Sequence, residues 1–239
     1  MNAAATSGAE RLRVGGFVPF TANDYPGALA AVVFCQGCPW RCGYCHNPHL
    51  LPARGGAVCE FDRILEWLES RRGLLDAVVF SGGEPTAQAA LGIAIAEVRA
   101  LGFRIGVHTA GAYRRRLDEL LPEIDWVGID IKAPLAAYER VTRTAHSGVA
   151  AWTSLDRVLA AGTSHEVRTT VHPTLTPAAA LESVARELAA RGVSRWVLQP
   201  FRATGCANAD VIAAGRDSAI DECLLARLKP HVADVVVRA

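Results

Sequence analysis

The sequence has no long apolar run, no excess of one charge and no leader-like N-terminus. None of its apolar runs approaches the roughly 18–20 residues that a membrane helix needs. Lys and Arg total 25 against 24 Asp and Glu, whereas a nucleic-acid-binding protein usually carries a basic excess. The first residues, MNAAATSGAE, lack the basic and apolar regions of a secretory signal. These absences predict a cytoplasmic protein that binds neither membranes nor nucleic acid.

Lysine is scarce, and cysteine is unevenly placed. The chain has two lysines, Lys132 and Lys229, against 23 arginines. Because the sequence uses Arg for generic positive charge, a remaining Lys is expected at a site that needs the compact ammonium group of lysine. The seven cysteines are an odd number, and four of them fall within eleven residues. This pattern indicates metal or redox chemistry rather than a disulfide framework.

The pattern of apolar residues predicts one α/β domain. A hydrophobic fraction of 51% in 239 residues is enough for a sizeable core. Residues 1–10 are expected to form a flexible tail and residues 11–239 a single domain. Apolar runs predict strands over 28–34, 76–80, 104–107, 126–129, 166–171, 195–198 and 232–237. Periodic segments between them predict helices over 61–72, 87–101, 113–121, 151–161, 177–191 and 218–229, and strands that alternate with helices indicate a parallel sheet.

Each of the first six predicted strands ends in, or leads into, a chemically unusual segment. In chain order these segments are CQGCPWRCGYCHNP, SGGEP, HTAG, DIKAP, RTTVHP and QPFRATG. In a (β/α) barrel the carboxyl ends of the strands share one face, and active sites lie there. We therefore predict a partial (β/α)6 TIM-like barrel, open on one side, in preference to a doubly wound sheet.

The first of these segments carries a candidate metal site. Cys38, Cys42 and Cys45 have the spacing C-x3-C-x2-C, and thiolates this close together can ligate irons of one [4Fe–4S] cluster. Three ligands on a cubane leave one iron open, as a catalytic metal site requires. Cys35 could act as a fourth ligand, which would give a closed electron-transfer centre or a structural zinc site. Its place at the end of a buried strand favours a buried, non-ligating thiol.

The residues CPWRCGYC (38–45) and SGGEP (81–85) resemble motifs of the radical S-adenosylmethionine superfamily. This resemblance implies a partial barrel and a [4Fe–4S] cluster on Cys38, Cys42 and Cys45. It also implies that S-adenosylmethionine chelates the fourth iron and is cleaved, on reduction, to a 5′-deoxyadenosyl radical that abstracts a hydrogen atom.

Further residues are expected to contact S-adenosylmethionine. Gly82 and Gly83 permit close backbone approach to a ligand, and Glu84 is expected to accept from its ammonium group. Asp130 and Lys132 alternate along a strand end and so point to the same side, which suits the zwitterionic methionyl moiety. The remaining expected contacts are Tyr44 and His46 beside the cluster, Thr109, Arg168 for a substrate carboxylate or partner peptide, Gln199, and Arg202 near the ribose. Cys59 and Cys223 are expected to be buried, and Cys206 to lie on the active face without a role.

Within the superfamily, the chain is similar to the activating enzymes of glycyl radical enzymes. The matching stretches are DYPG (24–27), CHNP (45–48), DIK (130–132) and QPFRATG (199–205). The resemblance implies a protein partner that carries a glycyl radical, foremost an anaerobic ribonucleotide reductase, and a reduced flavodoxin- or ferredoxin-like electron donor. Three alternatives stay open: a pyruvate formate-lyase type of partner, a small nucleotide or pterin substrate, and a non-catalytic iron–sulfur or zinc protein.

Overall fold

The computed structural model describes residues 11–54, 58–215 and 220–238. The expected flexible tail over residues 1–10 and the first two residues of the helix expected over 218–229 lie outside these ranges. The strands in the described part are β1 (Arg13–Thr21), β2 (Ala30–Cys35), β3 (Cys59–Glu60), β4 (Ala77–Gly82), β5 (Arg104–Thr109), β6 (Trp126–Asp130), β7 (Ser164–Val171), β8 (Arg195–Pro200) and β9 (Asp234–Val237).

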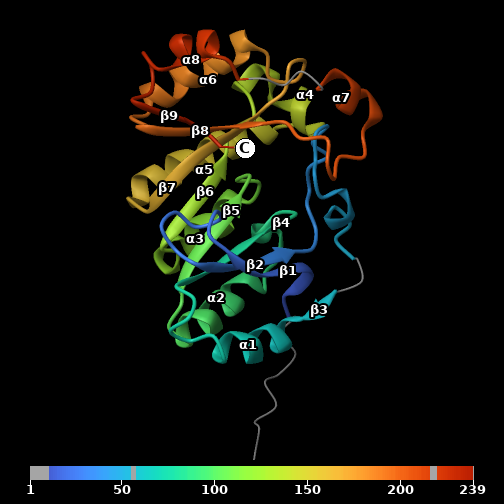
Figure 1. The fold of residues 1–239 in the computed structure, drawn as a ribbon, viewed down its shortest axis with the longest axis vertical. Helices are drawn as coiled ribbons and strands as arrows, with labels where there is room; N and C mark the ends of the chain where they lie inside the picture. Colours follow the sequence, from blue (N-terminus) through green and yellow to red (C-terminus); the bar gives the residue numbers. More distant parts are fainter. Residues whose placement is uncertain (1–10, 55–57, 216–219, 239) are drawn as a thin grey trace, which may run out of the picture.

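The helices lie between the strands in the order that the sequence pattern predicts (Figure 1). The α-helices are α1 (Phe61–Glu69), α2 (Leu91–Ala100), α3 (Arg114–Leu120), α4 (Tyr138–Thr142), α5 (Ser147–Ala161), α6 (Ala178–Ala190), α7 (Ala209–Ala214) and α8 (Glu222–Leu228). Short 3₁₀ helices are η1 (Pro48–Leu50), η2 (Pro85–Ala87), η3 (Leu121–Glu123) and η4 (Leu135–Ala137). Gly162 caps α5 in the left-handed conformation with φ 67°.

The strands form one sheet in the order β3-β1-β2-β4-β5-β6-β7-β8-β9. From β2 to β9 every neighbouring pair is parallel, while β1 runs antiparallel to both β2 and β3. Because β3 and β9 stand at opposite ends of the sheet, the barrel is not closed. The predicted partial, open α/β barrel is confirmed.

Apolar side chains pack on both faces of the sheet. The larger cluster joins the sheet to its helices and includes Phe80, Ile95, Leu155 and Trp196. A smaller cluster fills the inside of the curved sheet with Tyr25, Ala28, Ala30, Val32, Ala77, Val79 and Trp126. The Tyr25 ring lies 5.5 Å from that of Trp126, so the segment between β1 and β2 packs inside the barrel.

Two strands and two α-helices of the described part were missed by the sequence pattern, besides the short 3₁₀ helices. Strand β1 contains Gly15, Gly16 and Pro19, which interrupt the alternation of a typical strand. Strand β3 has two residues, and helices α4 and α7 have five and six. Segments this short do not show a hydrophobic period.

Candidate functional site

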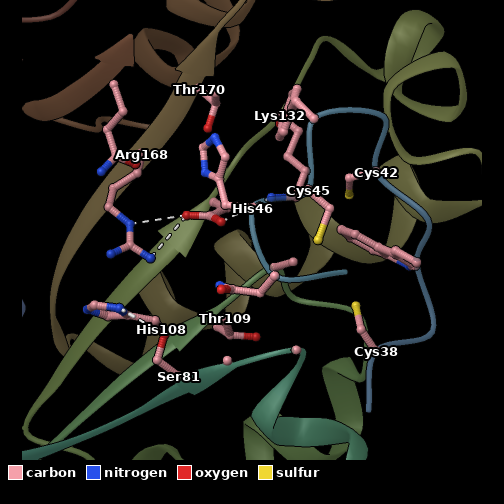
Figure 2. Close-up of a pocket in the computed structure, with 18 of the residues that line it drawn as sticks. Cys38, Cys42, Cys45, His46, Ser81, His108, Thr109, Lys132, Arg168 and Thr170 are labelled. Carbon is pink, nitrogen blue, oxygen red and sulfur yellow. Dashed lines mark hydrogen bonds and ion pairs between the residues drawn. The ribbon is translucent and has the colours of Figure 1, made fainter. Parts of the chain in front are cut away.

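Loops from six parallel strands meet at one cavity, as predicted. The cavity has a volume of about 290 Å³ and lies at the carboxyl ends of the strands. Its lining comes from the carboxyl ends of β4, β5, β7 and β8 and from the segments that follow β2 and β6, represented by Ser81, Thr109, Thr170, Gln199, Cys38 and Lys132. Cys38, Cys42 and Cys45 lie on one side of this space, with Arg168 and His108 opposite (Figure 2).

The cysteine loop is held by backbone hydrogen bonds at its start and in its middle. Near its start, the Gly37 amide donates to the Leu50 carbonyl at 2.8 Å. Farther along, the Arg41 amide donates to Thr142 at 2.9 Å and the Gly43 amide to Val141 at 3.0 Å. These bonds fix the half-buried thiols of Cys38, Cys42 and Cys45 against the cavity.

The three thiols suit a multi-iron centre. Burial, followed by the nearby Glu84 carboxylate, raises the pKa of Cys38 to about 12, and burial also raises the pKa of Cys42. A metal centre would deprotonate such thiols by binding them. Within the described ranges, no three His, Cys, Asp or Glu side chains converge closely enough to hold one metal ion. Each ligand of a cubane binds its own iron, so a [4Fe–4S] cluster does not need the three thiols to converge on one ion.

The remaining cysteines do not line the cavity. Cys35 is fully buried at the end of β2, and burial raises the pKa of its thiol. Cys206 is half-buried, with its Sγ 3.8 Å from the Gly43 carbonyl. Cys59 is half-buried, and the expectation of a buried Cys223 is wrong because that residue faces solvent from α8.

Gly82 and Gly83 line the cavity where β4 ends, and neither position has room for a side chain. Gly82 has φ 111°, and a Cβ there would lie 2.5 Å from the Cys35 amide nitrogen. A Cβ on Gly83 would overlap the Gly37 carbonyl. The glycines therefore let the β4 loop pack directly against the start of the cysteine loop.

Glu84 does not face the cavity, and the structure does not support its expected role as an acceptor for a ligand ammonium group. Its side chain is fully buried. Its Oε1 accepts from the Thr86 amide, the Thr86 hydroxyl and the Thr109 hydroxyl, and its Oε2 accepts from the Ala110 amide at 2.8 Å. Burial raises the pKa of Glu84, while these four donors oppose that shift. The carboxylate joins the loop after β4 to the loop after β5.

Asp130, Lys132 and Arg168 form a buried charge network beside the cavity. Lys132 Nζ lies 3.0 Å from Asp130 Oδ2, and Arg168 Nε lies 3.1 Å from Asp130 Oδ1 (Figure 2). Burial disfavours the charge of Asp130, but the two cations overcome this and lower the pKa of Asp130 to about 2. Burial also opposes the charge of Lys132, yet Asp130 and Tyr44 raise the pKa of Lys132 well above its usual value. Both shifts favour the ion pair between Asp130 and Lys132, and Arg168 is a second cation beside the same carboxylate.

The other expected contacts divide into two groups. Tyr44, His46, Thr109 and Gln199 line the cavity, and the Lys132 Nζ lies 5.8 Å from the Tyr44 ring centroid. Arg202 is not part of the lining: its side chain is exposed, and its carbonyl oxygen lies 2.8 Å from His46 Nε2. The expected contact between Arg202 and a ribose is therefore not supported.

Sequence reasoning missed the part that Thr170 takes in the lining, whereas His108, from the HTAG segment, lies at the cavity as that segment was expected to. Thr170 lies two residues after Arg168 on β7, and strand alternation places both on one face. The same argument that paired Asp130 with Lys132 could have found it. His108 lies between the Ser81 hydroxyl, 3.3 Å from Nδ1, and the Asp24 carbonyl, 2.9 Å from Nε2.

In a comparison with protein-family models, residues 32–186, more than half of the chain, match the radical SAM superfamily. This chain belongs to the radical SAM superfamily. A Methanocaldococcus jannaschii protein named as a glycyl-radical enzyme activating enzyme is 34% identical over 140 residues, 56% of either chain. The pyruvate formate-lyase-activating enzyme of Clostridium pasteurianum is 36% identical over 114 residues, 46% of this chain and 48% of the relative. The chain spans about half the length of the curated relatives it matches.

Solved structures share the fold of this radical SAM protein. Streptococcus suis SuiB bound to precursor peptide SuiA matches with a TM-score of 0.64 at 12% identity, covering 87% of this chain and 48% of SuiB. Escherichia coli QueE matches with a TM-score of 0.55 at 16% identity, covering 96% and 94% of the two chains. In the part of the chain that the structure describes, no helix is long and apolar enough to cross a membrane.

Proposed function

We propose that this protein activates a glycyl radical enzyme, and that its partner is an anaerobic ribonucleotide reductase. The observation that carries the proposal is the cavity itself, which has three cysteines from one loop on one side and the ion pairs of Asp130 with Lys132 and Arg168 beside it. Relatives named as activating enzymes support the choice of reaction.

Cys38, Cys42 and Cys45 would hold a [4Fe–4S] cluster with one open iron. With S-adenosylmethionine bound, this group supplies on reduction a 5′-deoxyadenosyl radical that can abstract a hydrogen atom. The protein's own residues bind and orient. Lys132 offers an ammonium group to the methionyl carboxylate, Asp130 an acceptor to its amine, and Tyr44 an aromatic face to the adenine. Burial of the charge network strengthens these contacts, because water screens them less.

The open edge of the sheet supports a protein substrate. The end strands β3 and β9 do not pair with one another, so a peptide segment could reach the cavity from the side. A small heterocycle would not need such an opening. Arg168 and Thr170, which line the cavity from β7, are proposed contacts for the peptide.

The test is electron paramagnetic resonance of the partner after anaerobic incubation with the iron-reconstituted protein, S-adenosylmethionine and a reductant. A glycyl radical signal on the ribonucleotide reductase is the expected result. A signal on pyruvate formate-lyase alone would mean that the partner is a pyruvate formate-lyase and not a ribonucleotide reductase. Release of 5′-deoxyadenosine with no radical on either protein would favour a small substrate. No release at all would favour the interpretation of the protein as an electron carrier.

A further inference from the structure

A second cavity lies on the outer side of the cysteine loop. It has a volume of about 490 Å³, and its lining includes Arg41, Gly43, Arg143 and Asp210. Cys42 and Cys45 line this cavity as well as the main one. The loop is therefore a thin wall with the charge network on one side and the second cavity on the other.

Arg143, which caps the end of α4, and helix α7 both contribute to the lining of the second cavity. The last two residues of α4, Val141 and Thr142, accept the amides of Gly43 and Arg41, and α7 contributes Asp210. In Figure 1 the segment after β2 runs beside α4 and α7. The cavity is thus built from three segments that are far apart in the sequence.

The rim of the second cavity is basic. Arg41 and Arg143 are exposed, and Asp210 is the acidic residue of the lining. Arg143 has φ 52°, a left-handed backbone that is uncommon outside glycine, and such strain gathers at functional sites. A Cβ on Gly43 would lie 3.8 Å from Arg143 Nη2, so the guanidinium reaches over the cysteine loop.

We propose that this second cavity and its arginines are the docking surface for a small electron-carrier protein with an acidic face. The inference rests on the proposed function, in which S-adenosylmethionine and a peptide occupy the main cavity. An electron carrier would then reach the cluster from the second cavity, past Cys42 and Cys45. One electron passes to the cluster, the carrier is oxidised by one electron, and no bond forms or breaks in this step. Opposite charges speed such encounters, which are typically small and weak.

The first test measures binding rather than turnover. An acidic flavodoxin is titrated into the anaerobically reconstituted full chain by calorimetry, at low and at high salt. Arg143→Glu should raise the Kd at least tenfold at low salt, and Arg143→Asn, which tolerates the left-handed backbone, should raise it less. Asp210→Asn should lower the Kd. Raising the salt concentration should shrink all these differences. Arg186→Glu, exposed on α6, makes the same charge change elsewhere and should keep the Kd within twofold.

The second test compares two sources of electrons. With limiting reduced flavodoxin, Arg143→Glu should slow the formation of 5′-deoxyadenosine at least tenfold; with an uncharged photoreduced deazaflavin, the rate should equal that of the unaltered protein. Arg41 is left in place because its guanidinium donates to the Cys38 and Trp40 carbonyls and holds the loop.

The outcomes separate this inference from the proposed function. No binding of flavodoxin to the unaltered protein, or an unchanged Kd in both Arg143 variants, would overturn the docking surface whatever their iron content. Failure of the unaltered protein to cleave S-adenosylmethionine with deazaflavin would instead remove the proposed function, and the binding measurement would still decide the docking surface.

Discussion

Asp130 Oδ2 lies 3.0 Å from Lys132 Nζ, and this pair of a half-buried carboxylate and a buried ammonium group lies at the edge of the main cavity. The Lys132 side chain is 10% exposed and that of Asp130 is 31% exposed. Arg168 shares the same carboxylate, so removal of Lys132 does not leave Asp130 without a cation. This redundancy makes Lys132 a position where ligand binding can be separated from folding.

Lys132→Ala should weaken S-adenosylmethionine binding about ten- to a hundredfold and leave the iron content unchanged. The loss corresponds to one charge-assisted hydrogen bond of roughly 1.5–3 kcal/mol. Equilibrium binding to the anaerobically reconstituted protein measures it. Lys229→Ala, which removes the chain's other lysine at an exposed position, is the matched control. Equal affinity in the two variants would show that the pair is structural.

His108 should make the fold sensitive to mild acid. Its Nε2 must donate to the Asp24 carbonyl, so its Nδ1 is left to accept from Ser81. Burial, and then the charge of Arg168, lower the pKa of His108 to about 3. The unfolded chain binds this proton near pH 6.5, whereas the folded chain does not. Stability is therefore full above pH 6.5 and is lost as the pH falls toward 3.

His108→Gln should remove that sensitivity. Between pH 6.5 and pH 5 the unaltered protein should lose up to about 2 kcal/mol more unfolding free energy than the variant. Denaturant unfolding of metal-free protein measures this without a contribution from cluster loss. The exposed residue His231 provides the control as His231→Gln. Parallel pH curves for His108→Gln and the unaltered protein would contradict the prediction.

Glu84→Gln should destabilise the loops around the cavity although it removes no ligand contact. Both carboxylate oxygens of Glu84 accept hydrogen bonds, four in all. The amide nitrogen of Gln is a donor, so it would face at least one of these four donors without a hydrogen bond. We expect a loss of roughly 2–3 kcal/mol in unfolding free energy. The exposed Glu69→Gln is the control and should stay within about 0.5 kcal/mol. A fully stable Glu84→Gln variant would mean that the carboxylate is not the link between the two loops.

The sequence predicted the barrel because its signals are local. Buried parallel strands such as β4 and β6 are continuous apolar runs, and helices such as α5 and α6 are long enough to show a period. The carboxyl ends of parallel strands meet by geometry, so the six unusual segments could be placed on one face before any contact was known.

The parts that sequence could not give depend on contacts between distant residues. Thr109 lies 25 positions from Glu84, and its hydroxyl donates a hydrogen bond to the Glu84 carboxylate. This bond helps to hold the Glu84 side chain away from the cavity. Arg202 follows β8 by two residues, but its loop turns the side chain outward and leaves only its carbonyl to His46. Residue type and strand order predict neither outcome.

Whether Cys35 binds the cluster decides between an enzyme and an electron carrier. A cluster on four cysteines is coordinatively closed, whereas one on Cys38, Cys42 and Cys45 leaves an iron open for S-adenosylmethionine. Cys35 is fully buried in β2 and does not line either cavity beside the loop. Its pair position on β4 is Gly82, and a Cβ on Gly82 would meet the Cys35 backbone. This packing holds the Cys35 side chain in the core.

Cys35→Ala should therefore keep both the iron content and the cleavage of S-adenosylmethionine, at a cost in stability of about 1 kcal/mol for the lost sulfur. Cys38→Ala, Cys42→Ala or Cys45→Ala should each abolish the cleavage and lose the cluster. Iron and sulfide analysis after anaerobic reconstitution, together with 5′-deoxyadenosine release, distinguishes the two classes. Cys59→Ala, a half-buried cysteine away from the loop, controls for thiol loss in general. If Cys35→Ala loses iron as completely as the other three, the centre is closed, and the electron-carrier interpretation replaces the enzyme.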